Sequence, residues 1–346
     1  MKNLLTDIEC QTLARTIEAA HKIVLVCHIN PDGDALGAMT AMQSMLQRHG
    51  HEAVCVAPDR WPDNLNWMPG VADVLQYLRH EKEVEERISD ADLIVMLDHG
   101  KLDREGELGH LIATLPAPRI IIDHHPEPDT PCAVFTVCQP KFCAASEVLY
   151  RVADQLGWTN GLITEEAVSL YTGMMTDTGG FTFNSSRPEL FHIIAHLLET
   201  GIDKDRLYRN VYYTATPDRY RMLGYLLYAK MELLRDYHTS IMSLTNEERR
   251  RFNIRSGETD GFVNEPLCIE GMRLSIFLRE DTEKKGVIRL SLRSVDDFPC
   301  NEMAAEFFNG GGHLNASGGR LYCTMDEAIE QAKQAVRKYA GKLKQK

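Results

Sequence analysis

Three short segments of the chain place aspartate and histidine directly after runs of apolar residues. His28, Asp32 and Asp34 follow the run Ile23–Cys27, Asp98 follows Leu93–Leu97, and Asp123, His124 and His125 follow Ile120–Ile122. Carboxylates and imidazoles without thiolates suit Mn²⁺, and Mg²⁺, Fe²⁺ or Co²⁺ could also bind to them. Because so many carboxylates would repel one another without cations between them, these residues predict a site for two divalent ions.

Two ions about 3.5–4 Å apart can clamp a phosphoryl group and lower the pKa of a bound water to ~7. The residues therefore indicate hydrolysis at phosphorus. A structural explanation also exists, because Asp32 and Asp34 could cap a helix that begins at Ala35, and Asp98 and the two histidines could be ordinary loop and pocket residues. That explanation requires three strand ends to be polar for unrelated reasons, so we prefer the metal site.

The elements that must position these side chains are short strands. Residues 23–27, 53–57, 93–97 and 120–122 are apolar throughout, as in parallel strands that are buried on both faces, and helical patterns such as 35–48 lie between them. The carboxyl ends of parallel strands lie along one edge, where open α/β sheets bind ligands. We therefore expect the aspartates and histidines to meet at that edge.

The rest of the chain adds a helical stretch and further strands. Thr6 and Glu9 match a capping box that begins a helix running to about Ala20. We expect helices over 144–156, 164–175, 188–200 and 217–234, strands over 273–279, 287–294 and 320–323, and a terminal helix over 326–342. The expected fold class is α/β, with an N-terminal parallel sheet that has helices on both faces, a helical connector and a smaller C-terminal α/β domain.

The composition limits the possible functions. The 346 residues include 38 Lys and Arg against 50 Asp and Glu, and the net charge of −12 argues against a broad surface for duplex nucleic acid. A hydrophobic fraction of 44% excludes a mainly disordered chain. No apolar run reaches the ~18 residues of a membrane span, and the first residues do not resemble a signal peptide. Nine scattered cysteines without a CxxC pair indicate reduced thiols, so we expect a cytoplasmic protein.

Taken in order, the motifs resemble the DHH phosphoesterase family. They are His28-x3-Asp32-x-Asp34-Ala35-x-Gly37, Asp98, Asp123-His124-His125-Pro126 and Thr176-Asp177-Thr178-Gly179. Ser291-Leu292-Arg293-Ser294, Gly310-Gly311-Gly312-His313 and the segment 315–319 are similar to the family's type-1 associated C-terminal domain. The resemblance covers essentially the whole chain. It implies a catalytic domain over 1–187, a helical connector over 188–236 and a substrate-binding domain over 237–346, with the active site in the cleft between the domains.

The resemblance also implies a role for each site residue. His28, Asp32 and Asp98 would bind one ion, and Asp34, Asp98, His124 and Asp177 would bind the other, so that Asp98 bridges the two. Asp123 would orient a histidine. His125 would contact the scissile phosphate or assist departure of the leaving group.

The C-terminal motifs are expected to bind the substrate. Backbone amides of Gly310, Gly311 and Gly312 can approach an anion closely, His313 adds a donor, and Arg293, beside Ser294, can bind a phosphate with its fork of donors. The structural alternatives are a plain turn for the glycines and a solvated sheet face for Arg293, which shares that face with Arg289.

Within this family, the chain length and the acidic composition favour the compact group of nanoRNases and pAp phosphatases. The expected function is hydrolysis of short oligoribonucleotides to mononucleotides, removal of the 3′-phosphate of adenosine 3′,5′-bisphosphate (pAp), or both, by water activated at two metal ions. One alternative is a standalone phosphodiesterase for cyclic di-AMP or pApA, and another is a nucleotide-binding module without catalysis. The expected partners are short single-stranded RNA or small nucleotides, without duplex nucleic acid or membrane, and the chain could form a homodimer.

Overall fold

The apolar segments of the N-terminal half form one parallel sheet in the computed structural model, which describes residues 3–101, 106–126, 132–255 and 257–344. The strand order is β3-β2-β1-β4-β5-β6. The strands are β1 (Lys22–Val26), β2 (Glu52–Ala57), β3 (Leu75–Gln76), β4 (Leu93–Leu97), β5 (Arg119–Asp123) and β6 (Phe135–Cys138). All four strands expected in this half are therefore confirmed.

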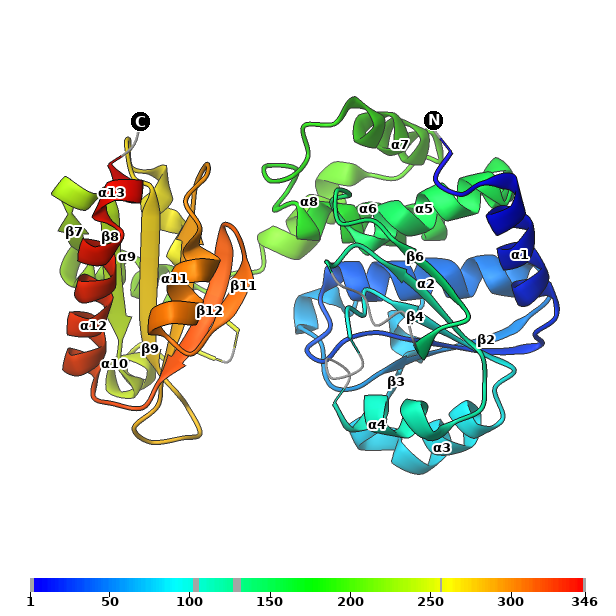
Figure 1. Cartoon of the computed structure of the whole chain (residues 1–346), viewed down its shortest axis with the longest axis horizontal. Coiled ribbons are helices and arrows are strands. Elements are labelled where there is room, and N and C mark those ends of the chain that lie inside the picture. The colour runs from blue at the N-terminus through cyan, green and yellow to red at the C-terminus, as the bar shows by residue number, and fades with distance from the viewer. Residues whose placement is uncertain (1–2, 102–105, 127–131, 256, 345–346) are drawn as a thin grey trace. The chain divides into compact units, whose positions relative to one another are not determined.

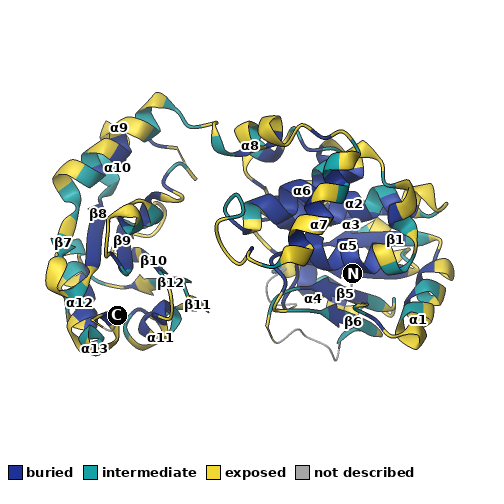
Figure 2. Ribbon diagram, turned by 90° about the horizontal axis from the view of Figure 1, so that it is seen from above, coloured by how far each residue is buried: buried dark blue, intermediate teal, exposed yellow. Residues whose placement is uncertain are grey.

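Helices cover both faces of this sheet (Figure 1). The helices α1 (Asp7–Glu18), α2 (Gly33–Arg48), α5 (Ala145–Gln155) and α6 (Thr164–Asp177) lie on one side, and α3 (Tyr77–Ser89) and α4 (Glu107–Thr114) lie on the other. Successive strand residues enter opposite cores, since Leu25 packs with the first set and Val26 with the second. Burial on both faces explains why the central strands show no alternation of polar residues, and Figure 2 shows the middle of this sheet as buried.

The helices α2 and α6 pack so closely that their backbones are in contact. A Cβ atom on Gly37 of α2 would lie 2.4 Å from the carbonyl oxygen of Ser169 in α6, and one on Gly173 of α6 would lie 2.8 Å from Oδ1 of Asp34. Only glycine permits so close a contact at these positions. The approach brings the first turn of α2 beside the last turns of α6.

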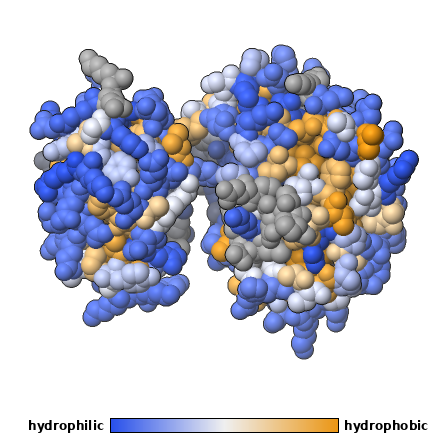
Figure 3. All heavy atoms as spheres, in the orientation of Figure 1, coloured by the Kyte–Doolittle hydropathy of each residue, from blue (hydrophilic) through white to orange (hydrophobic). Residues whose placement is uncertain are grey.

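The chain divides into two compact units, Met1–Thr214 and Ala215–Lys346. The segment expected as a connector is shared between them. Helices α7 (Pro188–Glu199) and α8 (Lys204–Tyr212) belong to the first unit, and α9 (Pro217–Tyr225) belongs to the second. On the face drawn in Figure 3, hydrophilic residues predominate on the second unit, whereas the first unit shows a broad area of hydrophobic residues beside hydrophilic ones.

The second unit has a mainly antiparallel sheet, in which only β8 and β9 pair in parallel. The strand order is β11-β12-β10-β9-β8-β7, with β7 (Glu232–Leu234), β8 (Thr239–Leu244), β9 (Leu274–Glu280), β10 (Ile288–Ser294), β11 (Gly311–His313) and β12 (Ala316–Leu321). The helices α11 (Cys300–Phe307), α12 (Met325–Lys338) and α13 (Ala340–Leu343) pack on one face around Leu292. On the other face, α9 and a short helix over Phe262–Cys268 pack around Phe277, and α10 (Asn246–Arg251) follows β8.

Two expectations for this unit were wrong. The helix expected over 217–234 leaves the α-helical form after Tyr225, continues as a π-helix over Leu226–Lys230 and gives way to β7, whose residues pair with β8. The last strand covers Ala316–Leu321 instead of 320–323. Its small residues do not resemble a strand in the sequence, but they allow close packing, because a Cβ on Gly319 would lie 2.5 Å from the carbonyl oxygen of Phe308.

Within the described residues, no helix has the length and the apolar character needed to cross a membrane.

Candidate metal centre

The carboxyl ends of β1, β4 and β5 bring the predicted aspartates and histidines to one place. The last residue of β1 pairs with Met96, and Met96 pairs with Ile121. Two residues further along the three strands are His28, Asp98 and Asp123. Strand β2, which follows β1 in the chain, lies on one side of β1, whereas β4 and β5 lie on its other side. Parallel sheets bind ligands at such a reversal of strand order.

His28, Asp32 and Asp98 form the first group that could hold a metal ion. One ligand atom of each lies within 4.8 Å of the other two. Nε2 of His28 is 3.3 Å from Oδ2 of Asp98 and 4.0 Å from Oδ2 of Asp32. Nδ1 of His28 lies 2.7 Å from the carbonyl oxygen of Ile29. A hydrogen bond donated there fixes the ring and leaves Nε2 as the ligand atom.

Asp34, His124 and Asp177 form the second group. Nε2 of His124 is 3.3 Å from Oδ2 of Asp177 and 4.0 Å from Oδ2 of Asp34. Nδ1 of His124 faces the carbonyl oxygen of Phe142 at 3.3 Å, so this ring is held in the same way as that of His28. Asp177 is the last residue of α6, which extends two residues beyond the helix expected from the sequence.

Asp98 lies between the two groups. Its Oδ2 is 3.3 Å from Nε2 of His28, and its Oδ1 is 3.5 Å from Nε2 of His124. The backbone of Asp98 has a φ of 50°, in the left-handed region that residues other than glycine seldom adopt and that often marks functional positions. Oδ1 is buried, and its polar neighbours are the imidazole nitrogens of His124 and His125. Such an oxygen fits a carboxylate that bridges two cations, and the surrounding imidazoles and carboxylates fit Mn²⁺.

The pKa values at the site reflect the crowding of carboxylates. Burial lowers the pKa of His28 and of His124, but the hydrogen bonds and charge of Asp98 outweigh burial and raise these values to about 9 and about 11. Burial and the charge of Asp98 raise the pKa of Asp34 to about 7. Without cations the site therefore retains protons at neutral pH, because they reduce the repulsion between carboxylates. Divalent ions would replace these protons.

Asp32 and Asp34 also have the capping roles considered as the structural explanation. Asp32 caps α2, because its Oδ1 accepts hydrogen bonds from the backbone N–H groups of Asp34 and Ala35. Asp34 is fully buried and accepts from the backbone N–H groups of Ala145 and Ser146, at the start of α5. The capping of α5 thus comes from a side chain of α2. Both aspartates still contribute a carboxylate oxygen to the metal-binding groups, so the two explanations hold together.

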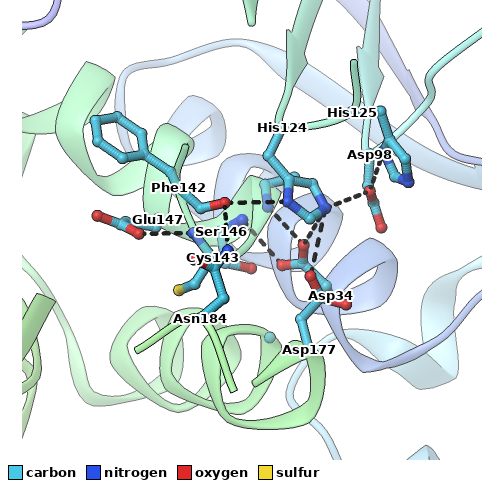
Figure 4. A network of polar contacts seen from close by, with 12 residues as sticks. Asp34, Asp98, His124, His125, Phe142, Cys143, Ser146, Glu147, Asp177 and Asn184 are labelled. Atoms are coloured by element: carbon cyan, nitrogen blue, oxygen red, sulfur yellow. Dashed lines mark hydrogen bonds and ion pairs between the residues drawn. The ribbon is translucent and has the colours of Figure 1, made fainter. Parts of the chain in front are cut away.

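Glu147 holds the segment before α5 in place, and the sequence analysis missed it (Figure 4). Its buried carboxylate accepts hydrogen bonds from the backbone N–H of Cys143 at 3.0 Å and from the guanidinium groups of Arg151 and Arg187. Burial raises the pKa of Glu147, but Arg187, the Cys143 N–H and Arg151 outweigh burial and lower it. The same segment presents the Phe142 carbonyl to His124. The sequence signal was weak: a glutamate on the apolar side of a helix, four residues before an arginine.

Asp123 and His125 form a third pair beside Asp98. Oδ1 of Asp123 lies 2.9 Å from Nδ1 of His125 and accepts from the backbone N–H groups of His124 and His125 at 2.7 and 3.1 Å. Nδ1 of His125 is also 3.2 Å from Oδ1 of Asp98. The carboxylate therefore holds both the ring of His125 and the peptide segment that contains the two histidines.

The second unit places Arg293 and His313 in one row on the same face of its sheet. Arg293 of β10 pairs with Ala316 of β12, and Ala316 pairs with His313 of β11. Residues directly opposite in neighbouring strands point to the same face. Gly311 and Gly312 form the edge strand β11 with His313, and a Cβ on Gly310, just before this strand, would lie 1.9 Å from the carbonyl oxygen of Gly318. The packing of β12 against Gly310 thus requires glycine there for structural reasons.

Of the remaining predicted substrate-binding residues, Gly311 has open space around it, whereas Gly312 packs against β12 and Ser294 is hydrogen-bonded. A Cβ on Gly311 would meet nothing within 4 Å, whereas one on Gly312 would lie 2.6 Å from the carbonyl oxygen of Ala316. The Ser294 hydroxyl donates to the carbonyl oxygen of Phe298 at 2.8 Å and accepts from the side chain of Asn315 at 2.9 Å. Ser294 is therefore engaged in the turn after β10.

Comparison with known proteins gives the family. Residues 22–174 match the DHH family, N-terminal domain, and residues 236–342 match the DHHA1 domain. The crystal structure of an exopolyphosphatase-related protein from Bacteroides fragilis is 43% identical, covers 100% of both chains and has a TM-score of 0.96. This chain belongs to the DHH family. The α/β fold and the enzyme class, a hydrolase of phosphate ester bonds, are thereby confirmed.

Two further proteins help to place this DHH-family chain. The bifunctional oligoribonuclease and PAP phosphatase NrnA of Thermus thermophilus is 27% identical over 324 residues, which is 91% of this chain and 89% of that protein. RecJ of the same organism, solved in complex with Mn²⁺, is 15% identical with a TM-score of 0.54, over 98% of this chain and 55% of RecJ. The likeness to RecJ shows a shared fold.

Proposed function

We propose that this DHH-family phosphoesterase hydrolyses short oligoribonucleotides to mononucleotides and removes the 3′-phosphate of pAp, with two divalent ions that are Mn²⁺ in the active protein. The similarity to the Thermus NrnA extends over nearly the full length of both chains, which supports this substrate class. The alternative of a standalone phosphodiesterase for cyclic di-AMP lacks comparable support.

One observation carries the proposal of two ions. The two carboxylate oxygens of Asp98 face different histidines, His28 and His124, at 3.3 and 3.5 Å. Nε2 of each histidine also faces a second carboxylate, that of Asp32 in one group and that of Asp177 in the other. A carboxylate that offers one oxygen to each of two such groups supports a pair of ions that share Asp98 as a ligand.

The residues of the chain would bind the ions and orient the substrate. Bound divalent ions would polarise the phosphoryl oxygens and lower the pKa of a water molecule. Burial lowers the pKa of His125, but the hydrogen bonds to Asp123 and Asp98 raise it to about 9, so this ring holds a proton at neutral pH. We assign His125 to the scissile phosphate and the leaving oxygen, and Asp123 to the orientation of that ring.

The second unit would bind a terminal phosphate. Arg293 and His313 lie in one row on one sheet face, and Gly311 and Gly312 precede His313 in β11, with Gly310 just before that strand. An arginine fork and close backbone amides are suited to a phosphate group. Ser294 would support this subsite through the turn that it stabilises.

Further parts of the proposal concern partners and location. We propose single-stranded substrates and no binding of duplex nucleic acid, which the net charge of −12 supports. We also propose a cytoplasmic protein that can form a homodimer.

The decisive experiment is a hydrolysis assay in Mn²⁺ with pAp, pApA, longer single-stranded RNA, cyclic di-AMP and pyrophosphate. We expect Mn²⁺-dependent release of mononucleotides from pAp, pApA and short RNA, and little turnover of the cyclic dinucleotide or of pyrophosphate. A strong preference for cyclic di-AMP would replace the proposal with the phosphodiesterase alternative. Nucleotide binding without turnover in any metal would replace it with a binding module.

A further inference from the structure

Three arginines cross the sheet of the second unit in one row. Arg289 of β10 pairs directly with Arg320 of β12 on one side and with Arg279 of β9 on the other. Directly opposed residues share a face, with Cβ atoms about 4.5–5.5 Å apart, and like charges in such pairs destabilise a sheet. We call Arg279, Arg289 and Arg320 the arginine row. Its cost to the fold suggests a role outside folding.

The arginine row shares its face with Arg293 and His313. Alternate residues of a strand point to one side, so Arg289, Ser291 and Arg293 of β10 project from the same face. Four residues separate Arg289 from Arg293, which places the two rows about 13 Å apart along the strand.

Over β10, β12 and β11 the surface between the two rows is almost free of side chains, whereas on β9 the residue opposite Ser291 is Phe277, which is buried beneath α9 and the helix Phe262–Cys268. Ser291 of β10 pairs with Gly318 of β12, and Gly318 pairs with Gly311 of β11. A Cβ on Gly311 would meet nothing within 4 Å, and one on Gly318 would meet only a backbone oxygen at 3.4 Å. An extended chain can therefore lie close to β10, β12 and β11 between the rows.

Local acids neutralise the arginine row only in part. Nε of Arg289 donates to the buried carboxylate of Asp281, but the Arg289 side chain remains 44% exposed. Arg279 contacts the Thr259 hydroxyl at 2.8 Å and Asp260 at 3.6 Å, and its side chain is 31% exposed.

No acidic residue of the described structure balances the charge of Arg320. Arg320 is exposed, and it forms no ion pair with any residue that the structure describes. The second unit also has slightly more Lys and Arg than Asp and Glu, although the whole chain has a net charge of −12. A positive patch on this face therefore stands out from an acidic protein.

We propose that the arginine row is a second phosphate-binding subsite that holds the sugar–phosphate backbone of an oligoribonucleotide while Arg293 and His313 hold another phosphate of the same strand. This inference rests on the proposed function. The separation of about 13 Å exceeds the distance between adjacent phosphates of a nucleic-acid strand. A nucleoside bisphosphate therefore fills one row, whereas a strand with three or more phosphates fills both. The arginine row favours oligonucleotides over pAp.

The substitution Arg320→Gln tests this inference in the full chain. Arg320 is exposed and without an ion pair in the described structure, so its loss leaves the fold intact. The matched control is Arg337→Gln, because Arg337 is an exposed arginine of α12, the helix that packs on the opposite sheet face. The measurements are KM and kcat in Mn²⁺ for pAp and for a 5′-phosphorylated tetraribonucleotide, each at several salt concentrations.

We expect Arg320→Gln to raise the KM for the tetranucleotide about tenfold, as for the loss of one charge-assisted phosphate contact, with KM for pAp unchanged. The slope of log KM against log salt for the tetranucleotide should fall by about 0.7, the contribution of one phosphate contact on a single strand. Equal changes for both substrates, or no change beyond that of Arg337→Gln, would overturn the inference.

A binding experiment separates this inference from the proposed function. If the wild-type protein hydrolyses neither substrate, the proposed function fails, and fluorescence anisotropy with a labelled tetraribonucleotide in the absence of Mn²⁺ still tests the arginine row. About tenfold weaker binding by Arg320→Gln would support the subsite. Equal affinities, or no binding by the wild-type protein, would refute it.

Discussion

At the scale of single residues, Asp98 combines properties that are costly for the fold. It is a buried carboxylate in the left-handed backbone region, and its neighbours include Asp34 and three histidines. The three histidines lower the pKa of Asp98 well below its usual range against the effect of burial, so this group stays ionised. A residue under these constraints is best explained by its action on cations.

The substitution Asp98→Ala should remove activity in a single step. We expect the rate in Mn²⁺ to fall by about 10³-fold or more, because a ligand of both proposed ions is lost. Calorimetric titration should show the loss of both Mn²⁺ equivalents, while circular dichroism reports an unchanged fold. Hydrolysis at the wild-type rate, or the loss of only one equivalent, would contradict the bridging role.

The raised pKa values of His28 and His124 predict that Mn²⁺ binding depends on pH. An imidazole binds a metal only in its neutral form, and pKa values of about 9 and about 11 keep both rings protonated at neutral pH before the metal binds. The apparent affinity should therefore rise with pH, with protons released on binding. Calorimetry in buffers of different ionisation enthalpy measures this release, and an affinity independent of pH would refute the prediction.

The same pKa values predict that the stability of the metal-free protein falls as the pH rises, whereas the Mn²⁺ affinity rises. A histidine whose pKa is raised from 6.5 to about 9 stabilises the fold fully below 6.5, and this contribution is lost as the pH rises through about 9. Thermal unfolding without metal should therefore occur at lower temperature as the pH rises through this window.

At the scale of elements, the segment 142–146 links the core to the candidate metal centre. Its Phe142 carbonyl faces His124, and its last two backbone N–H groups bind Asp34. Glu147 keeps the segment in place through Arg151 and Arg187. The arrangement of the second metal-binding group therefore depends on an ion-pair network that has no direct contact with a metal.

The substitution Glu147→Gln should disturb both folding and metal binding. It leaves two guanidinium groups without their carboxylate, and we expect the free energy of unfolding to fall by about 3 kcal/mol or more. Mn²⁺ affinity at the group that contains His124 should weaken while the group that contains His28 keeps its ion. Urea unfolding and calorimetric titration measure the two effects.

The control for this substitution is Glu165→Gln, which changes an exposed glutamate of α6. We expect its unfolding free energy to stay within about 0.5 kcal/mol of the wild type. If Glu147→Gln behaves like this control in both measurements, the network does not position the site.

At the scale of the whole molecule, the candidate metal ligands and the arginine row belong to different units. His28, Asp98 and their partners all lie in Met1–Thr214, which has its own sheet and cores. Mn²⁺ at 100 times its Kd should stabilise the first unit by about 2.7 kcal/mol. Amide hydrogen exchange should accordingly slow in β1, β4 and β5 and remain unchanged in β8 to β10.

Asp98→Ala serves as the control for this experiment, because it should abolish the effect of Mn²⁺ on exchange. Equal slowing of exchange in both units of the wild-type protein would contradict a site confined to the first unit.

The sequence was sufficient to predict the first sheet. Its strands are apolar on both faces, and each is followed by the polar residues that the carboxyl edge of a parallel sheet collects. Prediction was poorer in the second unit, where β12 begins with Ala316, Ser317 and two glycines. Such residues have weak strand preferences, and only the close approach of Phe308 and β11 explains them.

The sequence by itself determined which residue types end the buried strands, and thus the ligand chemistry and the family, because neighbours along the chain suffice to encode these patterns. The tertiary structure alone decided which oxygen of Asp98 faces which histidine, that Glu147 holds the segment before α5, and that Arg279 and Arg320 flank Arg289. These relations depend on the register and packing of segments far apart in the chain, and a shift of one residue would turn every side chain of a strand to the other face.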